Sequence, residues 1–175
     1  MALVRNIETR GLRHSAKFAP ASGQTFVKGD FLVFNGSGQL TIAVAAGNNV
    51  GGGALIVGQA NENALDDYGN LRLSVGVTLA QPGTQFKLPI YHATASSAVF
   101  NPNELGGQYE LAFTSGSVWG VDIGHNTNKA AVIVDVAGED YPGWLTGTSS
   151  GAGTVLYPNV WIELRSEFTA LTGAR

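Results

Sequence analysis

Short runs of β-branched, leucine and aromatic residues alternate with turn residues along most of the chain. Phe31–Phe34 and Leu40–Val44 flank the turn Asn35-Gly36-Ser37-Gly38, and an Asn-Gly pair between two such runs predicts a β-hairpin, because both residues accept positive φ. From residue 71 to 79, leucine and valine alternate with less apolar residues, which predicts one half-buried strand. The other predicted strands are Ala54–Val57, Phe86–Tyr91, Tyr109–Phe113, Val118–Ile123, Ala130–Val136, Val155–Tyr157 and a last one from Asn159 through Leu164.

Helical patterns are scarce. Asn61–Tyr68 fits one or two helical turns, and the residues after Leu164 fit a loop or a short helix. Many short strands separated by turn residues indicate an all-β fold, an antiparallel β-sandwich or barrel. Residues 1–24 show no clear period and contain a proline and a glycine near their end. We therefore predict an extended N-terminal arm over residues 1–24 and a single sandwich or barrel domain over residues 25–175.

The composition narrows the classes of protein that this chain can be. The 175 residues include 44% hydrophobic residues, only 13% charged residues, 24 glycines and no cysteine. The apolar share excludes a fully disordered chain, and the lack of cysteine excludes a disulfide framework or a cysteine-based metal site. Soluble domains carry about 25% charged residues. With so few charges, much of the surface is neutral or apolar. A protein tolerates such a surface best where neighbouring molecules cover it.

Charge is unevenly distributed along the chain. Five of the ten bases and two of the 13 acids fall in residues 1–30, which leaves five bases and 11 acids for the rest. A basic arm on an acidic body indicates an interacting segment, and we predict that Arg5, Arg10, Arg13 and Lys17 contact a partner. These cations are dispersed and have no aromatic residues interleaved among them, so nucleic acid is not the expected partner.

No stretch of the sequence is typical of targeting or of a membrane span. Arg5 interrupts the only apolar run at the start of the chain, and no window approaches 18 uncharged apolar residues. We therefore expect a protein that is made in a cytoplasm and does not bind a membrane.

The histidines, serines and acidic residues do not show the sequence pattern of a known catalytic or metal site. His14, His92 and His125 lack the spacing of a metal-binding pair, and no serine occurs in a Gly-x-Ser-x-Gly elbow. The adjacent acids Asp66-Asp67 and Glu139-Asp140 point apart in an extended chain, so they are poor acid–base pairs. We expect no enzyme, no catalytic residue, no cofactor and no metal site.

The tryptophans suggest a binding role instead. Trp119 and Trp161 are flanked by valine and isoleucine, which favours a place in the core or in a subunit contact. Trp144 follows Tyr141-Pro142-Gly143 and is the one aromatic residue expected at the surface. It could anchor a protein partner or lie at the centre of a carbohydrate-binding site.

Several stretches between residues 24 and 164 together give a pattern of short apolar strands and turns that can be compared with known families. The combined pattern resembles the head decoration, or capsid cement, proteins of tailed bacteriophages. Such proteins are β-rich, commonly trimeric and bind the outer surface of a mature capsid at its symmetry axes. No site residue transfers, because the likeness carries no site motif. The stretches are Phe26–Phe34, Ala54–Ala60, Pro89–His92, Phe100–Pro102, Tyr109–Leu111, Val118–Asp122 and Ala131–Val136.

The resemblance implies a structural virion protein. It would bind the major capsid protein on the exterior of the capsid and form a homotrimer. Several folds serve this role, jelly rolls among them, and we expect a jelly-roll-like sandwich or barrel here. The arm would reach neighbours by strand addition or by pairing arginine with carboxylates. The alternative from another class is a carbohydrate-binding β-sandwich module on a virion or cell surface, with its site around Trp144.

Overall fold

The computed structural model describes residues 8–44, 48–51, 54–92, 102–114, 117–125, 127–137 and 159–170. These residues contain β-strands and two short 3-10 turns, η2 (Pro102–Glu104) and η4 (Ser166–Phe168), and no α-helix. The predicted all-β class is therefore confirmed. No helix within these ranges is long and apolar enough to cross a membrane.

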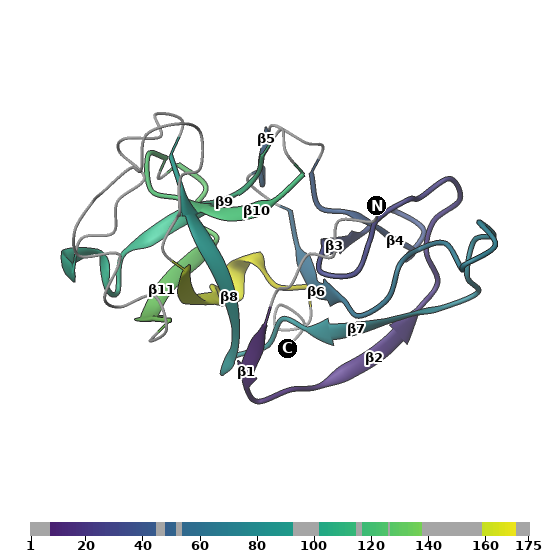
Figure 1. The fold of residues 1–175 in the computed structure, drawn as a ribbon, viewed down its shortest axis with the longest axis horizontal. Helices are drawn as coiled ribbons and strands as arrows, with labels where there is room; N and C mark the ends of the chain where they lie inside the picture. The colour runs from purple at the N-terminus through teal and green to yellow at the C-terminus, as the bar shows by residue number, and fades with distance from the viewer. Residues whose placement is uncertain are drawn as a thin grey trace.

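Five strands close into a small mixed barrel, at the left of Figure 1. The ring runs β8–β10–β9–β11–β12 and returns to β8. The β8–β10 pair is parallel and the other four pairs are antiparallel. Two short strands extend the ring, since β1 pairs with β8 and β5 pairs with β9. The bounds are β1 Thr9–Gly11, β5 Asn48–Asn49, β8 Thr84–Tyr91, β9 Gln108–Phe113, β10 Trp119–Asp122, β11 Ala131–Val136 and β12 Asn159–Leu164.

A separate antiparallel sheet of five strands lies at the right of Figure 1, in the order β2–β7–β6–β3–β4. The β3–β4 pair is the hairpin predicted from Asn-Gly, with Leu32 opposite Ile42. Its turn is held by the Asn35 side chain, and the residue with positive φ is Gly38 rather than Gly36. The bounds are β2 Ser15–Phe18, β3 Phe31–Phe34, β4 Leu40–Ile42, β6 Ile56–Ala60 and β7 Val75–Leu79.

The five-stranded sheet has a hydrophobic cluster on each face. Phe31 belongs to the cluster that fills the barrel, whereas the next residue, Leu32, belongs to the cluster on the opposite face. Every residue of β7 is buried, including Gly76 and Thr78. Val75, Val77 and Leu79 belong to the second cluster, whereas Gly76 and Thr78 on the other face lie beside Asn61 and Glu62. The half-buried strand predicted from residue 71 was therefore wrong in burial and in length. Its first two leucines precede β7 and are exposed.

The described part of the predicted arm is built into both sheets. β1 pairs with β8 of the barrel, and β2 pairs with β7 of the five-stranded sheet. Residues 8–24 therefore follow the body, with a turn between β1 and β2 and another at residues 22–23, as Figure 1 shows in purple. The sequence pattern missed both strands because neither Thr9–Gly11 nor Ser15–Phe18 contains a run of β-branched or large apolar residues such as the one in β3.

Four further predictions have different outcomes. The described strands do not show a jelly roll, because the pairing closes one group of strands into a barrel with a parallel pair. Residues 61–68 form turns rather than a helix. The strand through Leu164 and the short turn after it are both observed, as β12 and η4. The predicted strand Val155–Tyr157 lies outside the described residues.

Candidate interaction surface

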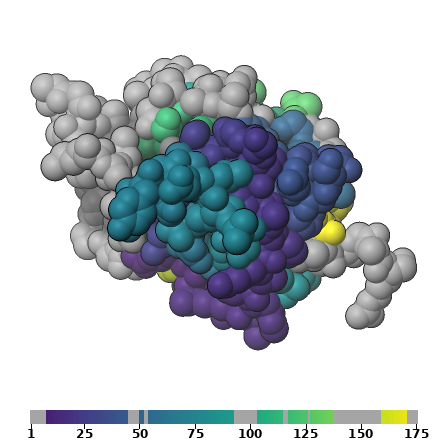
Figure 2. All heavy atoms as spheres, turned by 90° about the vertical axis from the view of Figure 1, so that its right-hand side faces the viewer, coloured from purple at the N-terminus to yellow at the C-terminus, as the bar shows by residue number. Residues whose placement is uncertain are grey.

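The segment between β6 and β7, residues 61–74, protrudes from the five-stranded sheet; we call it the β6–β7 loop. It stands out at the right of Figure 1 and forms the teal bulge on the face shown in Figure 2. The carboxylate of Asp66 organises its tip by accepting hydrogen bonds from the backbone N–H groups of Tyr68 at 2.9 Å and Asn70 at 2.8 Å. The N–H of Asp66 donates to the carbonyl of Asn70 at 2.8 Å, which closes the turn.

The base of the β6–β7 loop is fastened to the body. The side chain of Ala64 is fully buried, and its backbone N–H donates to the carbonyl of Phe26 at 2.9 Å. The N–H of Arg72 donates to the carbonyl of Ala64, and the Arg72 guanidinium lies 3.7 Å from the Glu62 carboxylate. These contacts fix the conformation of the loop before any partner binds.

This fixed loop exposes large apolar side chains. Tyr68 is 90% exposed and Leu73 is 94% exposed, and Leu71 beside them is also exposed. Single exposed apolar residues are common, but here three fall within six positions of one rigid loop, and we refer to these three side chains as its apolar patch. Rigid aromatic and apolar groups of this kind are typical anchors of protein interfaces.

The same loop is acidic. It carries Glu62, Asp66 and Asp67 against a single base, Arg72, which faces Glu62. The backbone N–H of Asn70 holds the pKa of Asp66 below its usual value, so that this carboxyl is ionised at neutral pH. Asp67 makes no hydrogen bond or ion pair with another described residue and is exposed. The apolar patch therefore has a negative border.

A second exposed patch lies on the turn between β1 and β2, residues 12–14, which we call the β1–β2 turn. Leu12 is 62% exposed, and its backbone N–H donates to the carbonyl of Gly83 at 3.1 Å. The hydroxyl of Thr84 donates to the carbonyl of Leu12 at 2.6 Å. Arg13 is exposed and makes no ion pair within the described part of the chain. This patch is small, fixed and positive.

The two patches lie at opposite ends of one strand pair. β2 and β7 are antiparallel, with Ser15 opposite Thr78 at one end and Phe18 opposite Val75 at the other. The β1–β2 turn leads into Ser15, and the β6–β7 loop leads into Val75. Figure 1 shows this separation, with the turn at the bottom and the loop at the far right.

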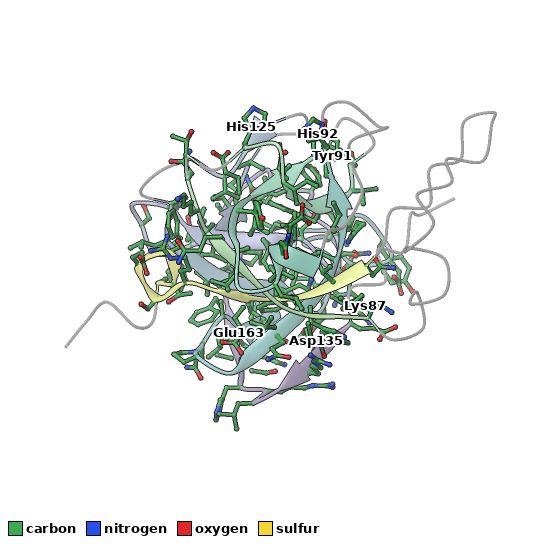
Figure 3. All side chains as sticks on the ribbon, turned by 90° about the vertical axis from the view of Figure 1, so that its left-hand side faces the viewer. Lys87, Tyr91, His92, His125, Asp135 and Glu163 are labelled. Carbon is green, nitrogen blue, oxygen red and sulfur yellow. The ribbon has the colours of Figure 1, made fainter. Side chains whose placement is uncertain are left out.

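Arg10 contacts its own barrel. One guanidinium nitrogen lies 2.7 Å from the carboxylate of Asp135, Nε donates to Gln85 at 2.6 Å, and the group stacks 4.4 Å above the ring of Trp161. The hydrogen bond from Arg10 holds the pKa of Asp135 below its usual value. Gln85 continues this polar row by donating to Glu163 at 2.8 Å, and Asp135 and Glu163 are both labelled in Figure 3. Arg10 therefore fastens β1 to the barrel.

The other predicted contact residues have different positions. Arg13 lies in the β1–β2 turn, and Lys17 is exposed on β2, an edge strand of its sheet. Arg5 and Trp144 lie outside the described residues. The carbohydrate-binding alternative depends on Trp144, so no described contact favours it.

Tyr91, His92 and His125 lie together at one end of the barrel in Figure 3. The buried carboxylate of Asp122 contacts Nδ1 of His125 at 2.8 Å, and this hydrogen bond raises the pKa of the imidazole. Buried Glu110, opposite Asp122 across the β9–β10 pair, accepts from two backbone N–H groups of the turn after β10. Both acids therefore hold this turn. No group of three or more histidine and carboxylate side chains in the described ranges is placed to hold a metal ion.

Sequence reasoning missed the β6–β7 loop as a site. It placed Leu71 and Leu73 on the buried face of a strand because they continue the alternation of Val75 and Val77. The signal against that interpretation was the run Asp66-Asp67-Tyr68-Gly69-Asn70, whose residues favour turns. A turn immediately before the leucines leaves no strand to bury them.

Comparison with known proteins assigns no family to this chain. No family model matches it, and no curated protein or solved structure is detectably similar to it. What bears on function is therefore the two patches, the charge distribution along the chain and the resemblance in the sequence.

Proposed function

We propose that this chain is a structural assembly protein that binds the outer surface of a mature bacteriophage capsid and stabilises it. The observation that carries the proposal is the fixed, exposed pair Tyr68 and Leu73 on the β6–β7 loop. A loop that is organised before binding loses little conformational entropy when it docks, so its apolar area contributes efficiently to affinity. An assembly protein needs such surfaces more than it needs a cleft.

Two separate patches support the same proposal. A decoration protein must contact more than one neighbour, and the β1–β2 turn and the β6–β7 loop face different directions from one rigid sheet. Weak contacts at several points give high overall affinity once copies are held side by side. The partners are the major capsid protein and further copies of this chain, in a homotrimer on the exterior of the virion.

The stabilising mechanism is binding linkage. A protein that binds the expanded shell and not the unexpanded shell shifts the equilibrium towards the expanded form by mass action. This mechanism requires no chemical step, so the proposed protein is not an enzyme. It would be made in the host cytoplasm. Decoration proteins use several β folds, so the proposal does not require a jelly roll.

The direct test is binding to capsids of the phage that encodes the chain. Purified protein is mixed with expanded capsids lacking decoration protein and with unexpanded procapsids, and occupancy is measured by sedimentation and electron cryo-microscopy. We expect saturable binding to expanded capsids alone and a higher melting temperature of the decorated shells. Expanded capsids that remain bare at saturating protein would overturn the proposal.

The structure improves the design of variants for this test. Deleting residues 1–17 would remove β1 and most of β2 and so damage both sheets. The exposed Lys17 can instead be changed to Glu, with Lys129→Glu as a control at another exposed lysine. We expect Lys17→Glu to lower capsid occupancy, most clearly at low salt, because screening weakens exposed charge contacts.

A further inference from the structure

We propose that the β6–β7 loop of one copy docks on the β1–β2 turn of a second copy, head to tail. In this contact Tyr68 and Leu73 pack against Leu12 of the neighbour, and Asp67 faces Arg13. The inference rests on the proposed role in assembly and names the surfaces that would join the copies.

Charge complementarity selects a second copy as the occupant. The loop has a negative border, with Asp67 exposed and unpaired within the described residues. The β1–β2 turn presents Arg13, and the next exposed residue along β2 with a charge is Lys17. Opposite charges at the rim steer the two surfaces together and disfavour loop-to-loop or turn-to-turn contacts.

The apolar parts also correspond. Leu12 is exposed next to Arg13 in the turn, and Tyr68 and Leu73 are exposed on the loop that carries Asp67. Association would remove these side chains from water, where each exposed Å² of apolar surface costs about 25 cal/mol. A tyrosine ring placed over the Arg13 guanidinium would add a cation–π contact. Each patch thus combines exposed apolar side chains with charge, negative on the loop and positive on the turn.

The position of the patches determines the type of assembly. They lie at opposite ends of the β2–β7 pair, so one chain cannot join its own loop to its own turn. A contact between two different patches is heterologous and leaves one free loop and one free turn at the ends of any pair. Further copies add until the ring closes. In a closed ring every loop is bound to a turn of the next copy, as expected of a cyclic homo-oligomer.

Both patches are organised in the single chain. The turn is held by hydrogen bonds to Gly83, Thr84 and Leu79, and the loop by Asp66 and by its contacts with the body. Little ordering is then needed on association, which favours binding between small surfaces.

Charge exchange tests the contact. The association of the wild type, Asp67→Arg, Arg13→Asp and the double variant is measured by light scattering after gel filtration and by sedimentation velocity. We expect the wild type to self-associate at about 100 μM and each single variant to associate at least about tenfold more weakly. The double variant should recover most of the wild-type association, because it restores opposite charges across every contact. Recovery is not expected from a merely structural effect of either substitution.

An apolar substitution gives an independent test. Leu73→Ser should abolish association, whereas Leu105→Ser, at a leucine that is 48% exposed outside both patches, should leave it unchanged. Thermal unfolding by circular dichroism checks that each variant is folded. A monomeric wild type at this concentration, single variants that associate normally, or a double variant without recovery would each overturn the inference.

Capsid binding separates this inference from the proposed function. If copies fail to associate but occupy expanded capsids, the head-to-tail contact is wrong and the decoration role stands. If copies associate as described and capsids remain bare, the contact stands and the decoration role is wrong.

Discussion

The carboxylate of Asp30 accepts a hydrogen bond of 3.0 Å from the indole Nε1 of Trp119, and each residue is only 1% exposed. Asp30 precedes β3 of the five-stranded sheet, whereas Trp119 begins β10 of the barrel. Phe31 packs edge-on against the same indole at 5.1 Å between ring centroids. This group of side chains therefore fixes the position of the sheet on the barrel.

Removing the carboxylate should destabilise the fold strongly. Asp30→Ala leaves the Trp119 Nε1–H and the Val27 backbone N–H without their acceptor in a buried place. We expect a loss of about 3 kcal/mol in the free energy of unfolding, measured by denaturant titration. The exposed Asp67→Ala serves as the control and should stay within about 0.5 kcal/mol. Equal effects of the two substitutions would contradict the structural role of Asp30.

A pair of glycines separates backbone strain from steric clash. Gly11 and Gly38 both have positive φ, of 83° and 74°. A Cβ added at Gly11 would lie 2.1 Å from the carbonyl oxygen of Gly83, whereas one at Gly38 meets nothing within 4 Å. We expect Gly38→Ala to cost about 1 kcal/mol from strain alone and Gly11→Ala about 3 kcal/mol or more. Thermal unfolding of the two variants measures the difference. A Gly11→Ala variant as stable as Gly38→Ala would show that β1 does not lie close to Gly83.

The contact between Arg10 and Asp135 should appear in the acid titration of the protein. The pKa of Asp135 is lowered from 3.8, so the contribution of this pair to stability is present above that pH and is lost as pH falls through the lowered value. Arg10→Gln should raise the pKa of this carboxyl back towards its ordinary value, as measured by carboxyl ¹³C NMR. The change in stability at neutral pH should stay within about 1 kcal/mol because the pair is exposed. An unchanged titration in Arg10→Gln would contradict the pairing.

His125 should titrate above the ordinary value of 6.5, because the hydrogen bond and charge of Asp122 favour its protonated form. Its contribution to stability is fully present below pH 6.5 and is lost as pH rises through the raised pKa in the folded state. The stability difference between wild type and His125→Asn should therefore shrink over that range. Imidazole NMR titration measures the midpoint directly. A midpoint at or below 6.5 would show that the contact does not form in solution.

The Asp66 carboxylate should control local order in the β6–β7 loop without affecting the whole fold. Asp66→Ala removes the acceptor of the Tyr68 and Asn70 N–H groups. We expect these two amides to exchange faster with solvent in hydrogen-exchange NMR, while the midpoint of global unfolding is unchanged. Head-to-tail association should weaken at the same time, because ordering the loop then opposes docking. Asp67→Ala, which leaves these bonds intact, is the control for the exchange measurement.

Much of the fold follows from local sequence. β3 matches its predicted bounds, and β8 to β12 lie within two residues of prediction. Strand period and turn residues act over a few positions, so they are visible in one sequence. β1 and β2 were missed because they lack an apolar run and gain their stability from β8 and β7, far along the chain.

The candidate site was predicted only in part. The charge distribution predicted a partner-binding segment at the N-terminus, and Arg13 and Lys17 of that segment are exposed. Arg10 has the same charge and a similar place in the sequence, yet it lies over Trp161. Charge alone cannot distinguish a cation that binds its own barrel from one that faces solvent.

The sequence by itself determined the all-β class, the hairpin at Asn35, most strand positions and the division into a basic start and an acidic remainder, since each depends on residue type and local spacing. The tertiary structure alone decided which strands close the barrel, that both faces of β7 are covered, and that Leu73 is left in water. It also brought Asp30 to Trp119, 89 positions along the chain. Alternation shows that a strand has two faces, but only the packing of distant segments decides what covers each face.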